Sequence, residues 1–168
     1  MPKDPEIKPI ETHWMGYRFR SRLEARWAVF FHSLGIRFEY ELEGFKLPSG
    51  WYLPDFWLPQ VSRWAEVKPG PFSERERRLC IELSESTGHA CLMLTGPPDF
   101  IEYAASEKMD GKYHDISYSL TTQYLDAERR FFCMGYPEGD TSPNYWGHDY
   151  LSAVYAARGA RFEHGEKP

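Results

Sequence analysis

Apolar residues at helical spacing mark the first regular element of the chain. From position 21 to 35 they recur every three or four positions, which is typical of a helix with one buried face, at Leu23, Trp27, Phe30, Phe31 and Leu34. The sequence Ser21-Arg-Leu-Glu24 is a capping-box pattern, and Gly35 suits the position just beyond a last helical turn. A helix is therefore predicted here, with Glu24 at the edge of the apolar stripe.

Alternating apolar and polar residues after this helix indicate strands. The run IRFEYELEGFKL at 36–47 predicts a half-exposed strand, and two further strands are predicted for WYLPDFWL at 51–58 and RWAEVK at 63–68. Turn residues separate the three runs. Because proline cannot donate to a strand ladder, Pro54 predicts a bend within the second strand.

A second helix is predicted from Ser73 to Gly88, and Ser73 with Glu76 three residues later again forms a capping-box pattern. The continuously apolar run ACLMLTG at 90–96 is expected for a strand buried on both faces. The order helix, three strands, helix, strand predicts an α/β fold in which helices flank a mixed central sheet.

The pattern divides the chain into three parts. Residues 1–16, rich in proline and charge, predict an N-terminal arm, residues 17–96 form the core, and residues 97–168 form an elaboration packed on it. In the last part the sequence predicts strands at KYHDISYSLTT and ERRFFCMGY, a loop at PEGDTSPNYWG and a helix at HDYLSAVYAARGARF.

Composition narrows the class of protein. The 168 residues include 42 % hydrophobic ones, which is typical of a globular chain. No apolar run approaches the roughly 18 residues that span a bilayer, and the first residues lack a secretory pattern, so a cytoplasmic protein without a membrane partner is expected. The three cysteines are scattered without a CxxC motif, and the histidines form no HExxH or HxxxH pair, which argues against disulfide, zinc-knuckle or histidine-built sites.

Three charged residues interrupt the strand pattern, and they carry the candidate chemistry. Glu66 and Lys68 are two apart in a strand, so their side chains point to the same face. A hairpin between 51–58 and 63–68 brings Asp55 close to Glu66, since paired strands lie about 5 Å apart. The preceding helix delivers Glu24 to the same place.

Such a cluster of carboxylates is costly without a partner, because like charges repel and raise one another's pKa. A divalent cation removes this conflict, and hard oxygen ligands suit Mg²⁺ or Mn²⁺. A bound cation polarises a phosphoryl oxygen, and a neighbouring lysine can orient the attacking water. These are the groups that hydrolysis of a phosphodiester needs.

The same residues carry a family resemblance. Pro54-Asp55, the spacing of eleven residues to Glu66, and Glu66-Val67-Lys68 resemble the signature of the PD-(D/E)XK nuclease superfamily. The predicted element order over residues 17–96 is similar to its restriction-endonuclease-like core. The stretch from position 17 to 68 looks like a phage- or mobile-element-borne branch. The arrangement of a helix glutamate before the Pro-Asp motif is also similar to heteromeric transposase cleavage subunits and resolvase-like nucleases.

The resemblance implies a Mg²⁺- or Mn²⁺-dependent DNA endonuclease. It implies that Asp55, Glu66 and the Val67 carbonyl bind the metal, that Lys68 positions or activates the water, and that Glu24 is an accessory carboxylate. The implied partner is duplex or branched DNA, and a homodimer or a larger nucleoprotein complex stays open. DNA is preferred to RNA only because the resembled families mostly cut DNA.

Structural explanations stand beside these roles. Glu24 is explained by a capping box alone, and the pair Glu66–Lys68 by an exposed cross-strand ion pair. An arginine group on the first helix either meets phosphates or forms a solvated face: Arg20, Arg22 and Arg26. Tryptophans 51, 57 and 64 either stack on bases or build the core.

The net charge of −5 neither favours nor excludes nucleic-acid binding, because basic residues still gather between positions 17 and 37. Two other functions also stay open. One is a catalytically silent nuclease-fold protein that binds nucleic acid or a regulatory partner. The other is an endonuclease subunit that is active only in a larger complex.

Overall fold

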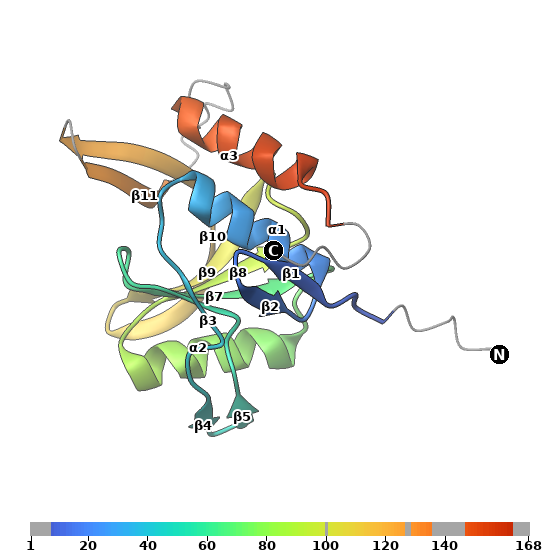
Figure 1. Ribbon diagram of the computed structural model, residues 1–168. Coiled ribbons are helices and arrows are strands. Elements are labelled where there is room, and N and C mark those ends of the chain that lie inside the picture. The colour runs from blue at the N-terminus through green and yellow to red at the C-terminus, as the bar shows by residue number, and fades with distance from the viewer. Residues whose placement is uncertain (1–7, 100, 127–128, 136–146, 163–168) are drawn as a thin grey trace.

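The structure, a computed structural model, describes residues 8–99, 101–126, 129–135 and 147–162 (Figure 1). These residues form a mixed α/β fold with three helices, α1 (Arg22–Ser33), α2 (Glu74–Thr87) and α3 (Gly147–Gly159). The strands in chain order are β1 (Thr12–Trp14), β2 (Tyr17–Phe19), β3 (Glu39–Tyr40), β4 (Phe45–Leu47), β5 (Gly50–Tyr52), β6 (Phe56–Leu58), β7 (Arg63–Lys68), β8 (Cys91–Thr95), β9 (Glu102–Met109), β10 (Lys112–Asp126) and β11 (Arg129–Gly135).

Seven strands form the central sheet, in the order β11-β10-β9-β8-β7-β6-β3. Strands β7 and β8 pair in parallel, and every other neighbouring pair is antiparallel. Helix α2 makes the connection between the two parallel strands, because a parallel pair needs a crossover. The predicted mixed sheet is therefore confirmed.

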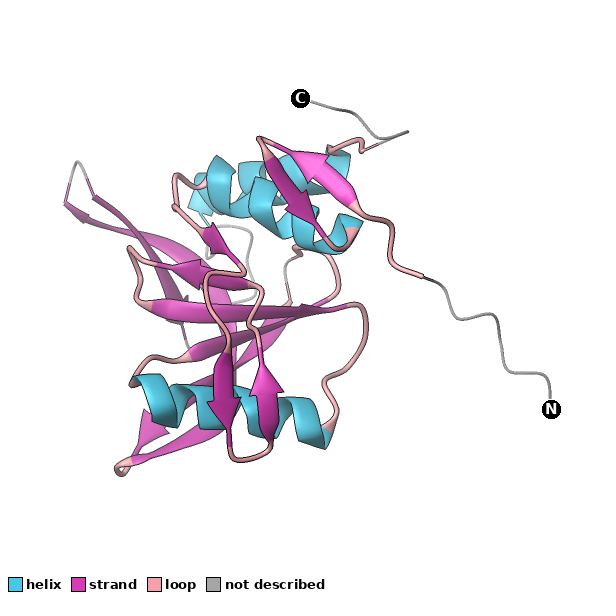
Figure 2. Ribbon diagram, turned by 60° about the horizontal axis from the view of Figure 1, so that its bottom comes forward, coloured by secondary structure: helices cyan, strands magenta, loops and turns pink. Residues whose placement is uncertain are grey.

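Helices cover both faces of this sheet (Figure 2). On one face Ala65 and Val67 of β7 belong to a large core with α1 and α3, in which Trp27 and Phe30 are fully buried. On the other face a smaller core is built around α2, from Leu47, Tyr52, Trp64, Phe72, Leu79, Cys80, Leu83, Cys91 and Met93. The alternation of β7 between these two layers follows from the period of two in a strand.

Two predicted strands are each divided in the structure. The run 36–47 contains β3 and β4, because Glu41 between them has a left-handed backbone (φ 46°) that turns the chain out of the sheet. The run 51–58 contains β5 and β6, and Pro54 lies at the break, as the sequence predicted. Strands β4 and β5 pair with each other as a separate hairpin.

The two ends of the chain add to this core. Residues 12–14, assigned by sequence to the N-terminal arm, form β1 and pair with β2. Strands β9, β10 and β11 continue the central sheet, and α3 packs beside α1. The sequence predicted β10, β11 and α3 but missed β9, and most of the predicted loop at 137–147 lies outside the described residues. Within the described ranges, no helix has the length and apolar character needed to cross a membrane.

Candidate functional site

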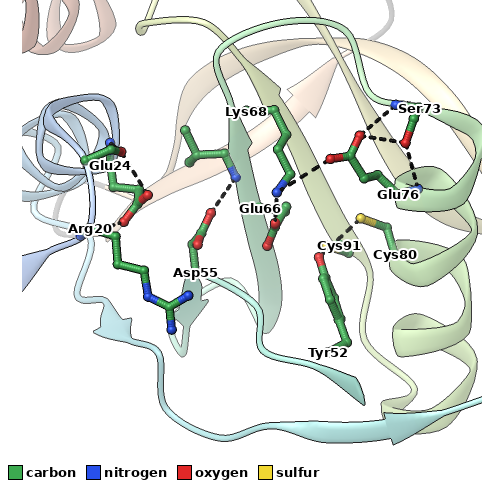
Figure 3. Close-up of polar contacts among 12 residues, drawn as sticks. Arg20, Glu24, Tyr52, Asp55, Glu66, Lys68, Ser73, Glu76, Cys80 and Cys91 are labelled. Atoms are coloured by element: carbon green, nitrogen blue, oxygen red, sulfur yellow. Dashed lines mark hydrogen bonds and ion pairs between the residues drawn. The ribbon is translucent and has the colours of Figure 1, made fainter. Parts of the chain in front are cut away.

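An open pocket of about 510 Å³ lies where β6 begins beside β7, between the N-terminal ends of α1 and α2. Its lining residues are Arg20, Glu24, Trp51, Tyr52, Leu53, Asp55, Glu66, Val67, Lys68, Glu76 and Leu79. Figure 3 shows the polar side chains that meet there. All the acidic residues and the lysine that the sequence singled out therefore line one pocket.

The β6–β7 hairpin positions Asp55 next to Glu66. Phe56 pairs with Ala65, so one further step of the antiparallel register places Asp55 opposite Glu66. The Asp55 side chain is held in place by the backbone N–H of Val67, which donates to Oδ2 at 2.8 Å. The expected approach of the two carboxylates across the hairpin is thus present in the structure.

The backbone at Val67 also faces this carboxylate. A second step of the register places Val67 opposite Pro54, which has no N–H to donate to a neighbouring strand. Because the N–H and the carbonyl of one strand residue point to the same side of the strand, the Val67 carbonyl points toward the Asp55 side. Because Pro54 has no N–H, it cannot donate a hydrogen bond to the Val67 carbonyl opposite it.

Glu66 is the most buried charged group of the pocket, with only 4 % of the residue exposed. Its Oε1 forms an ion pair with Lys68 Nζ at 2.8 Å. Its Oε2 is buried and meets no donor in hydrogen-bond geometry within the described part of the chain, although the Tyr52 hydroxyl is near enough to the carboxylate to oppose the rise of the Glu66 pKa. A buried carboxylate oxygen without a donor is costly, so this atom points to a ligand.

Glu76 is a pocket residue that the sequence did not assign to the site. It is the third residue of α2 and forms the capping box with Ser73, whose backbone N–H and hydroxyl donate to Oε2, both at 2.8 Å. Its other oxygen, Oε1, lies 3.7 Å from Lys68 Nζ. The capping-box glutamate of the second helix was visible in the sequence, but its reach across to β7 was not.

Tyr52 also lines the pocket, and its side chain lies near Glu66 and Cys80 (Figure 3). The side chain is buried, and its hydroxyl lies 3.5 Å from the Cys80 sulfur. Burial raises the pKa of Tyr52 well above its ordinary value, and burial likewise raises the pKa of Cys91. Both groups therefore stay neutral next to Glu66.

Burial dominates the electrostatics of the acidic pair. It raises the pKa of Asp55 well above its ordinary value, and the charges of Glu66 and Glu24 add to the shift. Burial also raises the pKa of Glu66, although Lys68 opposes the change. The pKa of Lys68 is raised, because the Glu66 carboxylate outweighs the effect of burial, so its side chain is an ammonium.

Glu24 lines the same pocket, but both of its oxygens already accept hydrogen bonds, from residues at the start of α1 and from β3. Oε1 accepts from the Ser21 hydroxyl at 2.8 Å, and Oε2 accepts from the Arg20 backbone N–H at 3.1 Å and from the Tyr40 hydroxyl. The Ser21 hydroxyl in turn accepts from the Glu24 backbone N–H at 3.1 Å. The Ser21 side chain thus caps α1 as predicted, whereas the Glu24 carboxylate accepts from the N–H of Arg20 rather than from that of Ser21, so the capping box is only half formed.

The three arginines lie in two places. Arg20 lines the pocket and pairs with Glu41 at 2.6 Å. Arg22 and Arg26 instead line a second pocket together with Arg158 and Arg161. Local pattern could not join these four arginines, because more than 130 positions separate Arg22 and Arg26 from Arg158 and Arg161.

Arg26 closes the end of α3 from within this second pocket. Its Nη1 donates to the carbonyls of Ala157, Arg158 and Ala160 at 2.6 to 3.1 Å, and its guanidinium lies over the Phe162 ring. These contacts satisfy carbonyls that have no partner within a helix end. The structure thus gives Arg26 an anchoring role between α1 and α3.

The donor set fits one hard cation. Asp55 and Glu66 supply two carboxylates, the Val67 carbonyl faces the same side, and Oε2 of Glu66 is buried without a donor. Within the described ranges, no group of three or more His, Cys, Asp or Glu side chains has the arrangement of a metal site. The groups that could hold a cation are therefore Asp55, Glu66 and the Val67 carbonyl, while Glu24 lines the same pocket with its oxygens engaged by Ser21, Arg20 and Tyr40.

Three comparisons with known proteins add nothing to this geometry. No protein-family model and no curated protein matches the sequence, and no solved structure matches the fold.

Proposed function

We propose that the chain is a divalent-metal-dependent endonuclease that hydrolyses DNA phosphodiester bonds on a restriction-endonuclease-like core. The observation that carries the proposal is the buried Glu66 carboxylate, whose Oε2 has no donor among the described residues and lies next to Asp55 across the β6–β7 hairpin. Two adjoining acids, Glu66 buried and Asp55 half-buried, both with raised pKa values, have a physical reason to bind a cation.

The element order supports the same fold. Helix α1, the strands up to β7, helix α2 and strand β8 follow one another as in the resembled superfamily, and the motif residues lie at the centre of the sheet. DNA rather than RNA follows from the resemblance alone.

Asp55, Glu66 and the Val67 carbonyl would hold Mg²⁺ or Mn²⁺. When bound, such an ion polarises the phosphoryl oxygen and lowers the pKa of a coordinated water. Val67 fixes the orientation of the Asp55 carboxylate through its N–H, so the ligand geometry is set before substrate binds.

Lys68 supplies the other polar group of the reaction. Its ammonium donates to Glu66 Oε1 and lies toward Glu76 at the start of α2. These two carboxylates hold Nζ at the mouth of the acidic pair, where it can donate a hydrogen bond to the attacking water or to a phosphoryl oxygen. Negative charge that develops on phosphate oxygens is stabilised by such a donor.

Metal dependence tests this function. Purified protein is incubated with supercoiled plasmid, linear duplex, flap, four-way junction and single-stranded DNA in Mg²⁺, Mn²⁺ or EDTA. The proposal expects cleavage of at least one DNA in either metal and none in EDTA. Absence of cleavage from the whole panel, together with measurable Mn²⁺ binding, would replace the free enzyme with an obligate subunit or a silent binding protein.

A further inference from the structure

The outer face of the β4–β5 hairpin presents an aromatic and a cationic side chain beside the pocket. Lys46 lies directly opposite Trp51 in this hairpin, so both point to the same face. The next residues, Leu47 and Tyr52, are buried against α2. The face with Lys46 and Trp51 therefore points away from the core.

Trp51 differs from the other two tryptophans of its region. Trp64 is buried, and Trp57 packs against Trp64 and His89 at ring distances of 4.6 and 5.1 Å. Trp51 is 71 % exposed, the largest exposed fraction of any large apolar side chain in the described part of the chain. Packing inside the protein explains why Trp57 and Trp64 are tryptophans, whereas no such packing explains the exposed Trp51.

The backbone holds the exposed ring in position. The indole of Trp51 lies against Gly44, where the methyl group of an alanine would collide with the ring. A glycine at this position lets the ring lie against the chain just before β4. The ring is thus a supported platform with one open side.

The surroundings of the platform match a nucleic-acid strand. Trp51 and Arg20 line the same pocket as Asp55 and Glu66, and the Arg20 side chain is 65 % exposed. Lys46 is exposed beside the ring. Exposed cations contact phosphates and an aromatic face stacks on a base, which is the combination that binds single strands.

We propose that Trp51 stacks on an unpaired base next to the phosphate that is cut, so that the substrate is DNA with a single-stranded or splayed segment. This inference rests on the proposed nuclease function and adds the class of substrate. In an intact duplex the neighbouring base pairs cover both faces of each base, so a side chain reaches a base face only where the base is unpaired or extruded. Lys46 and Arg20 hold the flanking phosphates.

The test measures binding separately from cleavage. Fluorescence anisotropy follows three labelled DNAs of equal length, a single strand, a duplex and a strand of abasic sites, in EDTA and again in Ca²⁺. The wild type is compared with Trp51→Phe, which keeps an aromatic face, and Trp51→Leu, which keeps apolar surface only. Gly44→Ala displaces the ring without removing it, and Met109→Ala on β9 is the control for an exposed apolar residue outside the pocket.

The proposal expects the wild type to bind the single strand more tightly than the duplex. Trp51→Leu should weaken single-strand binding by about tenfold or more, the scale of one lost stacking contact. Gly44→Ala should weaken it by less, Trp51→Phe and Met109→Ala should bind like the wild type, and the abasic strand should bind all variants equally.

The two proposals fail in different ways. If Trp51→Leu binds and cuts every DNA like the wild type, stacking is overturned, and Trp51 is left as a contact for another protein. If the variants behave as expected but no DNA is cut in Mg²⁺, the stacking platform stands and the free-standing nuclease is overturned. A wild type that binds none of the three DNAs in either solution overturns both.

Discussion

The backbone N–H of Val67 on β7 donates to Oδ2 of Asp55 at 2.8 Å, and Asp55 lies in the break between β5 and β6. The Asp55 carboxylate here accepts the N–H that a carbonyl of the neighbouring strand would accept in a continued ladder, and Pro54, opposite Val67, has no N–H to donate to the Val67 carbonyl. One hydrogen bond therefore fixes the first acidic group of the pocket against β7, directly opposite Glu66.

Removing the charge of Asp55 should stabilise the metal-free protein. Asp55→Asn keeps an oxygen that accepts from Val67 and removes the repulsion from Glu66 and Glu24. In EDTA its Tm should exceed the wild-type value by several degrees, whereas Mg²⁺ should raise Tm only in the wild type. Differential scanning calorimetry checks both, and a Tm below wild type in EDTA would make Asp55 part of a stabilising ion network.

The pH dependence of stability follows from the same group. The pKa of Asp55 is raised in the folded protein, so the folded state binds this proton more tightly than the unfolded state. Its stabilising contribution is complete below the unfolded pKa of about 4 and is lost as pH rises through the folded pKa. In EDTA, the free energy of unfolding of the wild type minus that of Asp55→Asn should therefore fall as pH increases from about 4.

Urea unfolding of the two proteins at matched pH measures this difference. The comparison matters because Glu76 acts in the opposite direction: although partial burial opposes the shift, hydrogen bonds from Ser73 and the charge of Lys68 lower the pKa of Glu76. A difference that stays constant with pH would show that Asp55 is ionised in the folded protein with an ordinary pKa.

Glu24→Gln separates helix capping from metal binding. The amide replaces one of two accepting oxygens, so a donor among Ser21, Arg20 and Tyr40 loses its partner, at a cost of about 1–3 kcal/mol in the free energy of unfolding. Because the proposed cation ligands do not include Glu24, cleavage should stay within about tenfold of the wild type. Loss of cleavage by Glu24→Gln at unchanged stability would instead make Glu24 a ligand.

Arg22 and Arg26 should respond in opposite ways although they share a pocket. Arg26→Met removes the donors to three carbonyls at the end of α3 and should lower the free energy of unfolding by about 2 kcal/mol or more. Arg22→Gln should leave stability unchanged, weaken DNA binding, and reduce the slope of log affinity against log salt by about one. Urea unfolding and binding titrations at several salt concentrations compare the two variants. If both variants lose the same stability and the same DNA affinity, the assignment of an anchoring role to Arg26 and a phosphate-binding role to Arg22 is wrong.

The sequence predicted those parts of the fold that depend on local pattern. The period of two placed Glu66 and Lys68 on one face, and the turn after position 58 paired the strands that carry Asp55 and Glu66. Pro54 predicted the break between β5 and β6. Capping patterns set the starts of α1 and α2, where Ser21 and Ser73 are the N-caps.

Features that depend on long-range contact were not predictable in this way. The left-handed backbone at Glu41, which divides the run 36–47, has no glycine or asparagine to announce it. Strand β9, with the sequence EYAASEKM, contains several small and polar residues and no clear alternation, so its strand conformation depends on pairing with β8 and β10. The contact of Arg26 with the end of α3 joins positions more than 130 residues apart.

The candidate site shows the same division. Asp55, Glu66 and Lys68 were predictable because one hairpin brings them together. Glu76 was not, because its place depends on how α2 packs beside β7. For Glu24 the sequence left two explanations open, and the contacts with Ser21, Arg20 and Tyr40 favour capping.

The most direct test of the central claim compares the cleavage rates of the wild type and Lys68→Ala, purified in parallel, on DNA with a single-stranded segment in Mg²⁺. Both proteins should fold and bind Mn²⁺, because Asp55 and Glu66 remain, which circular dichroism and calorimetry verify. The account predicts that Lys68→Ala cuts at least about a hundredfold more slowly. Equal rates would trace the cleavage to a contaminating nuclease or to another site and would contradict the assignment of this pocket as the catalytic centre.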